Sequence, residues 1–295
     1  MGADGGYLRG ALFPAKNHRA TAVLMSGRSE FIEKYFEVCA DLNARGISVA
    51  MMDWRGQGLS ERLLPVREKG HIQDFGVYRS DLAKFTEEIA TKEFAGPYIL
   101  MTHSMGGPPG LQLLADGNTN FKCAVLCAPM TRLFDDPVKR VLVRLIAKSV
   151  SALGGSRQSI FGVKEDSMDF ADNALTSDVT RHNRFRDIQL AAPNAMIREP
   201  TYGWLRAAFA CMDDLHAPDR FSALTTPILI VSAEDDRLVC PLDHHWLARQ
   251  SPLIECITVK AALHEVMMEA DEYREQYWQA FDNFVGKKLF TSTAS

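Results

Sequence analysis

Short apolar runs alternate with longer helical segments from Thr21 onward, and this alternation restricts the chain to few folds. Strands that alternate with helices build a mostly parallel sheet with helices on both faces, and continuous apolar runs fit strands that are buried from both sides. The fold class is therefore α/β. The apolar runs are TAVLM, ISVAMMD, PYILMTHS, KCAVLCAP, TPILIVSAE and ECITVK. The helical segments are 30–45, 76–92, 241–250 and 271–287.

The alternation stops between about residues 129 and 220, where helical patterns continue but no run resembles a strand. We therefore expect a β/α core of residues 1–128 and 221–295 that is interrupted by a helical insertion, 129–220. Residues 137–153 of the insertion carry one apolar helical face, which either lines a groove or packs on the core. That face contains Val138, Val141, Leu142, Leu145 and Ile146.

The strongest chemical signal is THSMGG, residues 102–107, where an apolar run ends and a helical segment begins. A serine at such a junction stands on a tight turn that projects its hydroxyl above the sheet and requires small neighbours. Gly106 meets this requirement, and the amide of Met105 at the helix start can stabilise an oxyanion. In the alternative interpretation, Thr102 or Ser104 only caps the helix. The position directly after a buried strand favours Ser104 as a nucleophile.

A serine nucleophile needs a base, and the base needs a carboxylate that orients it. His264 follows the last apolar run, so its loop reaches the same edge of the sheet as Ser104. Asp235 and Asp236 follow TPILIV, and both are candidates for the acid. The order serine, aspartate, histidine is typical of α/β-hydrolases. Most of the other histidines are interpreted as surface or capping residues: His18, His71, His103, His182, His216, His244 and His245.

A second oxyanion donor is expected from the loop LMSGRSE at 24–30. Gly27 lets the backbone turn there, and the amide of Arg28 then points to the serine, although a plain glycine turn is the alternative. The glycines of WRGQGLS lack the spacing of a nucleotide-binding motif. Neither an HExxH motif nor a carboxylate cluster suggests a metal, so we expect no cofactor.

The composition of the chain limits the classes of partner and the cellular compartment that we expect. The net charge of −4 provides no positive field that would attract nucleic acid. The six cysteines form no CxxC pair and are interpreted as buried thiols in a reducing compartment. The N-terminal MGADGGYLRG does not resemble a signal peptide, and no apolar run reaches the ~18–20 residues of a membrane span. We expect a cytoplasmic protein, with peripheral contact at a membrane compatible with the sequence.

Together these segments resemble the lysophospholipase and monoacylglycerol lipase group of α/β-hydrolases, a serine aminopeptidase S33-type group. The resemblance spans about residues 5–287. It implies that Asp236, directly before RLV, is the acid, that His264 is the base, and that the amides of Arg28 and Met105 bind the oxyanion. The matching segments are LMSGRSEFIEKY, DWRGQGLS, GHIQDF, THSMGG, LTSD, PTYGWLRAAF, AEDDRLV and LHEVMME.

Three departures from the pattern of this group leave every catalytic group in place. Ser26 stands where histidine is usual before Gly27, and Thr102 stands where glycine or alanine is usual. The segment DGGYL at 4–8 resembles the middle of the first hairpin of the group, so we expect the first strand to be shortened or missing.

The resemblance implies that residues 129–220 form a cap over the active site. It also implies hydrolysis of carboxylic esters of single-chain lipids, such as lysophospholipids or monoacylglycerols, through an acyl-enzyme on Ser104. The alternatives are a carboxylesterase for small soluble esters, an acyltransferase, and a catalytically silent α/β-hydrolase that binds a ligand or partner. The intact set of Ser104, Asp236 and His264 argues against the silent protein.

Overall fold

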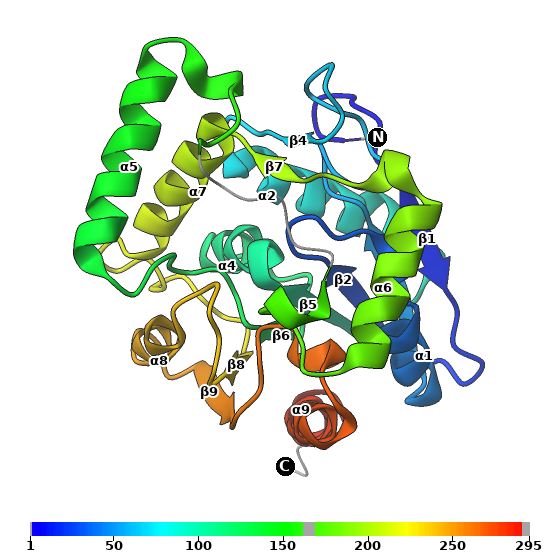
Figure 1. Ribbon diagram of the computed structural model, residues 1–295. Coiled ribbons are helices and arrows are strands. Elements are labelled where there is room, and N and C mark those ends of the chain that lie inside the picture. The colour runs from blue at the N-terminus through cyan, green and yellow to red at the C-terminus, as the bar shows by residue number, and fades with distance from the viewer. Residues whose placement is uncertain (1, 162–168, 291–295) are drawn as a thin grey trace.

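A seven-stranded sheet forms the centre of the computed structural model, which describes residues 2–161 and 169–290 (Figure 1). The strand order is β1-β3-β2-β5-β6-β8-β9, and every neighbouring pair is parallel except β1 with β3. The strands are β1 (Gly10–Phe13), β2 (Ala20–Met25), β3 (Ile47–Met52), β5 (Tyr98–His103), β6 (Cys123–Cys127), β8 (Ile228–Ala233) and β9 (Ile254–Val259). The predicted α/β class is confirmed, and each of the six apolar runs is a strand. The first strand of the sheet, β1, is present but only four residues long.

Helices cover both faces of the sheet, because successive strand residues point to opposite sides. Val23 of β2 belongs to the core beneath one group of helices, and its neighbour Leu24 belongs to the core beneath the other. The first group contains α2 (Phe75–Phe85), α4 (Gly107–Ala115), α7 (Tyr202–Leu215) and α8 (Pro241–Ala248). The second contains α1 (Phe36–Ala44) and α9 (Asp271–Val285). The short α3 (Thr91–Glu93) follows α2 in the chain and buries none of its side chains.

Between β6 and β8 the chain forms α5 (Pro137–Ala152), α6 (Val179–Ala191) and α7. The prediction that this stretch contains no strand is wrong in one detail. The two-residue strand β7 (Glu199–Pro200) pairs with β4 (Lys69–Gly70), and two residues are too few to produce a periodic pattern. No helix in the described part of the chain is long and apolar enough to cross a membrane.

Both expectations for the apolar face of α5 are wrong. Leu142 and Leu145 are each 56% exposed, so this face neither packs on the core nor lines a groove. The opposite side of the helix packs instead, with Ala147 fully buried and Val143 against the core. Figure 1 shows α5 at the left-hand edge of the molecule, with α7 on its inner side.

All six cysteines carry free thiols, and five of them are buried, as expected. Burial raises the pKa of Cys39 and Cys123 to about 12, and it raises the pKa of Cys240 and Cys256 to about 11. The thiols therefore act as small apolar groups of the core.

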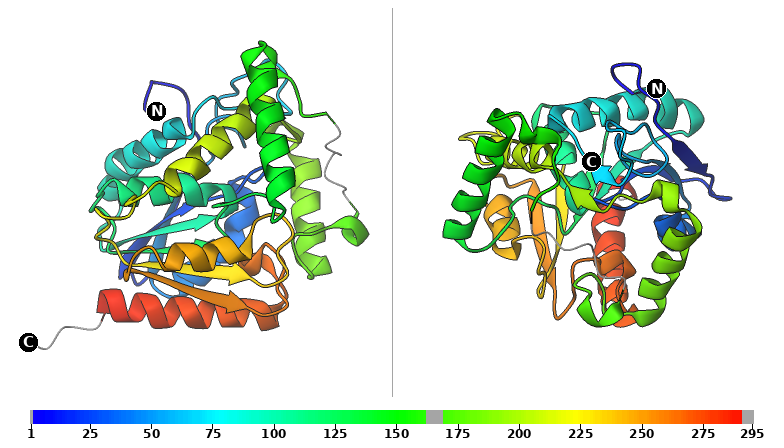
Figure 2. Two further views of the ribbon diagram at one scale, coloured as in Figure 1. Left: turned by 90° about the vertical axis from the view of Figure 1, so that its left-hand side faces the viewer. Right: turned by 45° about the horizontal axis from the view of Figure 1, so that its top comes forward.

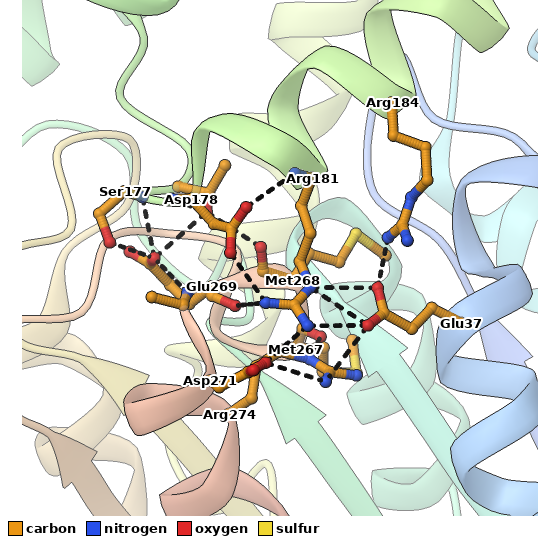
Figure 3. Close-up of polar contacts among 12 residues, drawn as sticks. Glu37, Ser177, Asp178, Arg181, Arg184, Met267, Met268, Glu269, Asp271 and Arg274 are labelled. Carbon is orange, nitrogen blue, oxygen red and sulfur yellow. Dashed lines mark hydrogen bonds and ion pairs between the residues drawn. The ribbon is translucent and has the colours of Figure 1, made fainter.

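Arg181 of α6 lies at the centre of a polar cluster that joins three helices (Figure 3). Its guanidinium donates to Glu37 of α1 at 2.8 Å and to Asp271 of α9 at 2.6 Å. Arg184 and Arg274 also contact Glu37. Burial opposes the ionisation of Glu37, but the hydrogen bonds from Arg181 and Arg184 and the charge of Arg274 lower its pKa from 4.5 to about 2. The cluster thus fixes one end of α6 to the body of the protein.

We expect Glu37→Gln to destabilise the fold by roughly 1–2 kcal/mol at neutral pH, after allowance for solvent screening of this half-exposed cluster. A depressed pKa stabilises the folded state above the unfolded value near 4.5, and this stabilisation is lost as the pH falls towards 2. Thermal melts should therefore show a difference from the wild type that is complete at neutral pH and shrinks below pH 4.5. The exposed Glu93→Gln serves as the control, and a difference that does not change with pH would contradict this account.

Candidate active site

Ser104 lies directly after β5, at the start of the turn that leads into α4. Its φ of +47° places it in the left-handed region, which non-glycine residues adopt at some cost in free energy. The turn is tight: a β-carbon on Gly106 would lie 2.8 Å from the carbonyl oxygen of Ser26, and one on Gly107 would lie 2.4 Å from Pro129 Cβ. The small residues after the serine are therefore required by packing, as the motif predicts.

The structure brings Ser104, His264 and Asp236 together in one hydrogen-bonded chain. His264 Nδ1 lies 2.6 Å from Asp236 Oδ2, and His264 Nε2 lies 2.8 Å from Ser104 Oγ. Because an ionised carboxylate only accepts hydrogen bonds, Nδ1 donates to Asp236, and Nε2 is left to accept the hydroxyl proton of Ser104. The second aspartate candidate, Asp235, is exposed and takes no part in this chain.

Asp236 is held by its own loop after β8. The amides of Leu238 and Val239 donate to its Oδ1 at 2.8 and 3.0 Å. Burial opposes its ionisation, but these amides and the hydrogen bond with His264 outweigh burial and lower its pKa. The carboxylate is therefore ionised at neutral pH and has its second oxygen directed at the imidazole.

The loop between β2 and α1 lies against the serine. A β-carbon on Gly27 would lie 3.1 Å from Ser104 Cβ and 3.1 Å from His103 Nδ1, so only glycine permits this approach. Arg28 lines the same cavity as Ser104, and Met105 is buried directly after the serine. Met105 thus adjoins the nucleophile in the chain, and Arg28 follows Gly27, which lies against the nucleophile.

A buried ionic cluster beneath the site was not predicted from the sequence. Lys34 Nζ donates to Glu30 Oε1 at 2.8 Å and also to Glu265, the residue after His264. Glu30 accepts a further hydrogen bond from Tyr35 at 2.6 Å and one from the amide of Gly27. The only sequence signals are the Glu-x-x-x-Lys spacing of 30–34 and the acidic residue that follows the histidine.

His103 completes this cluster. Its Nδ1 lies 3.2 Å from Glu30 Oε2, and its Nε2 lies 3.4 Å from the carbonyl oxygen of His264. Burial opposes its protonation, but the charge of Glu30 and the hydrogen bond to it raise its pKa. Both ring nitrogens face acceptors, which favours the doubly protonated ring.

The interpretation of most other histidines as surface or capping residues is wrong for three of them. His71, His103 and His244 are buried. His71 Nδ1 bonds Thr201 Oγ1 at 2.8 Å, and His244 lies between Ser232 Oγ at 2.8 Å and the carbonyl oxygen of Pro129 at 2.7 Å. Each of these buried rings hydrogen-bonds to residues on other elements, which the periodicity of a single sequence does not reveal.

The segment LTSD, residues 175–178, hydrogen-bonds to the loop that carries His264 and to Glu269 behind it. The amide of Glu265 donates to the carbonyl oxygen of Leu175 at 2.8 Å. The buried carboxylate of Glu269 accepts from the amide of Leu263 at 2.9 Å. It also accepts from the amide of Ser177 at 2.8 Å (Figure 3). Leu263 and Glu265, on either side of His264, are thereby fixed. The LTSD segment, which is part of the family resemblance, thus helps to position the His264 loop.

Ser104 and His264 open into a cavity of about 820 Å³. Its wall carries apolar side chains from the segment between β6 and β8, together with several basic side chains. The apolar residues include Val143, Ile160, Phe185, Ile188 and Trp204, and the basic ones include Arg28, Arg186 and Arg198. The volume and the mixed lining suit a ligand that has both an apolar and a polar part.

The chain is similar to known proteins along most of its length. The family model described as serine aminopeptidase, S33, matches residues 16–271. Lysophospholipase L2 of Escherichia coli strain K12 is 29% identical over 300 residues, covering 97% of this chain and 86% of that protein. The probable lysophospholipase L2 of Haemophilus influenzae is 28% identical over 276 residues, covering 92% and 85%.

Solved structures show the same fold. A soluble variant of monoglyceride lipase from Saccharomyces cerevisiae, in complex with a substrate analog, aligns with a TM-score of 0.78 at 19% identity, covering 98% of this chain and 94% of that one. Monoacylglycerol lipase of Paleococcus ferrophilus aligns with a TM-score of 0.75 at 18% identity, covering 95% and 99%. From the family match over most of its length and its α/β-hydrolase fold, the chain belongs to the serine aminopeptidase S33 family.

Proposed function

We propose that this protein hydrolyses carboxylic esters of single-chain lipids, such as lysophospholipids or monoacylglycerols, through an acyl-enzyme on Ser104. The observation that carries the proposal is the hydrogen-bonded chain from Asp236 through His264 to Ser104, which ends in a large cavity with an apolar wall. The names of the lysophospholipase relatives support the same substrate class.

His264 acts as the general base in this proposal. Its Nε2 takes the proton of Ser104 as the hydroxyl attacks the ester carbonyl, and it later returns a proton to the departing alcohol. Asp236 holds the ring in the productive tautomer and stabilises the imidazolium. Water, activated by the same histidine, then hydrolyses the acyl-enzyme and releases the fatty acid. The amides of Arg28 and Met105 stabilise the oxyanion of both tetrahedral intermediates.

We assign residues 129–220 to a cap and residues 1–128 and 221–295 to the hydrolase core. In this assignment the cap supplies the apolar side of the cavity, where Val143 and Ile188 contact the acyl chain. The buried, unpaired cysteines support a cytoplasmic location, and we propose that the protein meets its lipid substrate by peripheral contact with a membrane.

Ser104→Ala should abolish turnover of p-nitrophenyl esters and covalent labelling by a fluorophosphonate, because it removes the nucleophile. Loss of a triad member usually costs several orders of magnitude in kcat. A melting temperature equal to that of the wild type would show that the fold is intact. Retention of more than about a tenth of the wild-type kcat would exclude Ser104 as the nucleophile.

Asp236→Asn should reduce kcat by about 10⁴-fold, because the amide stabilises the wrong tautomer of His264. The neighbouring Asp235→Asn is the matched control, and it should retain nearly full activity since Asp235 is exposed. Steady-state kinetics on one soluble ester is sufficient for this comparison. Equal losses in the two variants, or a larger loss at Asp235, would refute the assignment of the acid.

The cavity predicts a chain-length preference. Each added methylene should raise kcat/KM by about three- to fourfold until the apolar wall is covered, since burial of a methylene contributes about 0.8 kcal/mol. Ile188→Trp, which fills part of the cavity, should shift the optimum to shorter chains while acetyl ester hydrolysis stays near normal. Leu190→Trp, on the same helix but 61% exposed, is the control. A uniform loss on every ester would argue against an acyl-binding role for Ile188.

A further inference from the structure

The loop DWRGQGLS, residues 53–60, follows β3 directly and contributes no member of the triad (Figure 2). Gly56 and Gly58 in this loop have φ values of +79° and +52°, and a β-carbon on Gly58 would lie 2.2 Å from Cγ of Asp53. The tight turn that the two glycines allow places Gln57 in the interior, where it is 1% exposed. Glutamine is rarely buried so completely, and a buried amide group needs hydrogen-bond partners. The partners of Gln57 therefore indicate what this loop does.

Gln57 contacts both segments that are expected to supply oxyanion donors. Its Oε1 accepts from the amide of Ser29, the residue after Arg28, at 2.8 Å. Its Nε2 donates to Sδ of Met105, a weak acceptor, at 3.4 Å. Met105 is itself fully buried. One side-chain amide thus joins the loop after β2 to the turn after β5.

The contact with Ser29 restrains the backbone around Arg28. Ser29 has a φ of +63°, in the left-handed region that serine rarely adopts, so this conformation needs support from its surroundings. On the other side of Arg28, the amide of Gly27 donates to the carboxylate of Glu30. The amides before and after that of Arg28 are therefore both engaged, which fixes the course of the backbone on either side of the expected donor.

Trp54 of the same loop provides a second attachment. Its Nε1 donates to the carbonyl oxygen of Ser26 at 2.8 Å, and its ring is fully buried. The 53–60 loop thus bonds to residues 26 and 29, at both ends of the stretch that carries the expected donor. The carbonyl oxygen of Ser26 is also the atom that a β-carbon on Gly106 would approach to 2.8 Å. The bond from Trp54 therefore acts at the point where this stretch meets the turn of the nucleophile.

We propose that Gln57 is a positioning residue for the oxyanion hole. It fixes the loop of Arg28 against Met105, while Trp54 fixes the other end of that loop. Gln57 is not among the described residues that line the cavity, so it acts on the reaction through the donors that it positions. The stabilisation of an oxyanion depends steeply on the placement of its donors. The inference rests on the proposed function, since an oxyanion forms only when Ser104 attacks an ester carbonyl.

The variant Gln57→Met keeps the length of the side chain but removes the amide group. On a soluble p-nitrophenyl ester it should lower kcat by about 10- to 100-fold and leave KM within about twofold, because displaced oxyanion donors weaken binding of the transition state and not of the substrate. Titration with a fluorophosphonate counts the competent serines, so that kcat refers to folded active sites. Gln112→Met is the matched control, because Gln112 is also buried but donates to Asp214. It should retain the wild-type kcat per competent serine.

Inhibitor binding separates a positioning role from a purely structural one. An alkyl trifluoromethyl ketone adds to the serine as a tetrahedral oxyanion, so its affinity for Gln57→Met should fall by the same factor as kcat/KM. The affinity for an ether analogue of the substrate, which forms no oxyanion, should not change. Trp54→Phe, which removes only the donor to Ser26, should show the same selective loss to a smaller extent, and it decides the question if Gln57→Met does not fold.

Two results would overturn the inference and leave the proposed function in place. One is a wild-type kcat per competent serine in the folded variants of Gln57 and Trp54. The other is an equal loss of affinity for the ketone and for the ether, which would indicate a general distortion of the cavity. A wild-type protein that neither hydrolyses esters nor reacts with the fluorophosphonate would instead overturn the proposed function, and this inference with it.

Discussion

The ion cluster around Lys34 is the constraint on which the geometry of the site depends. One ammonium group joins Glu30, which accepts from the amide of Gly27, to Glu265, which adjoins His264. His103, which adjoins Ser104, contacts the same Glu30. Three loops from distant parts of the chain thus meet on one pair of carboxylates. With Lys34 and His103 protonated, two positive charges balance two negative ones, which is the condition under which charges can be buried at acceptable cost.

Burial of these charges costs free energy, and it also restricts the cluster to one arrangement of partners. Burial opposes the charge on Glu30 and Lys34, but their partners outweigh it, so the pKa of Glu30 lies well below its ordinary value and that of Lys34 above it. Removing one partner would leave a charge without compensation in the interior, which is far more destabilising than losing the pair. The loops of Gly27, Ser104 and His264 are therefore held in a single relative position, which the proposed catalytic mechanism needs.

Much of this could be derived from the sequence, for a physical reason. Strands buried on both faces are continuous apolar runs, and the loops after parallel strands meet at one edge, so Ser104, Asp236 and His264 could be placed near one another before their distances were known. The choice of Asp236 over Asp235 required the resemblance, because both follow the same strand.

The rest depends on contacts that no local pattern encodes. Lys34 and Glu265 are separated by 231 positions, and only the fold brings them together. For α5, periodicity reveals an apolar face but does not tell which surface that face contacts. In the structure the helix packs through Val143 and Ala147 and leaves its broader apolar face exposed to water. The buried histidines were misread for the same reason, as their partners lie on other elements.

The buried cysteines have a consequence for redox chemistry. Oxidants and electrophiles attack the thiolate, and thiols whose pKa lies near 11 or 12, such as Cys39 and Cys240, are almost entirely protonated at neutral pH. In the proposed mechanism the nucleophile is the hydroxyl of Ser104, and the cysteine thiols take no part in it. A hydroxyl nucleophile does not enter the thiol oxidation ladder, so the proposed mechanism predicts that peroxide, which inactivates enzymes with a cysteine nucleophile, does not inactivate this site through its nucleophile.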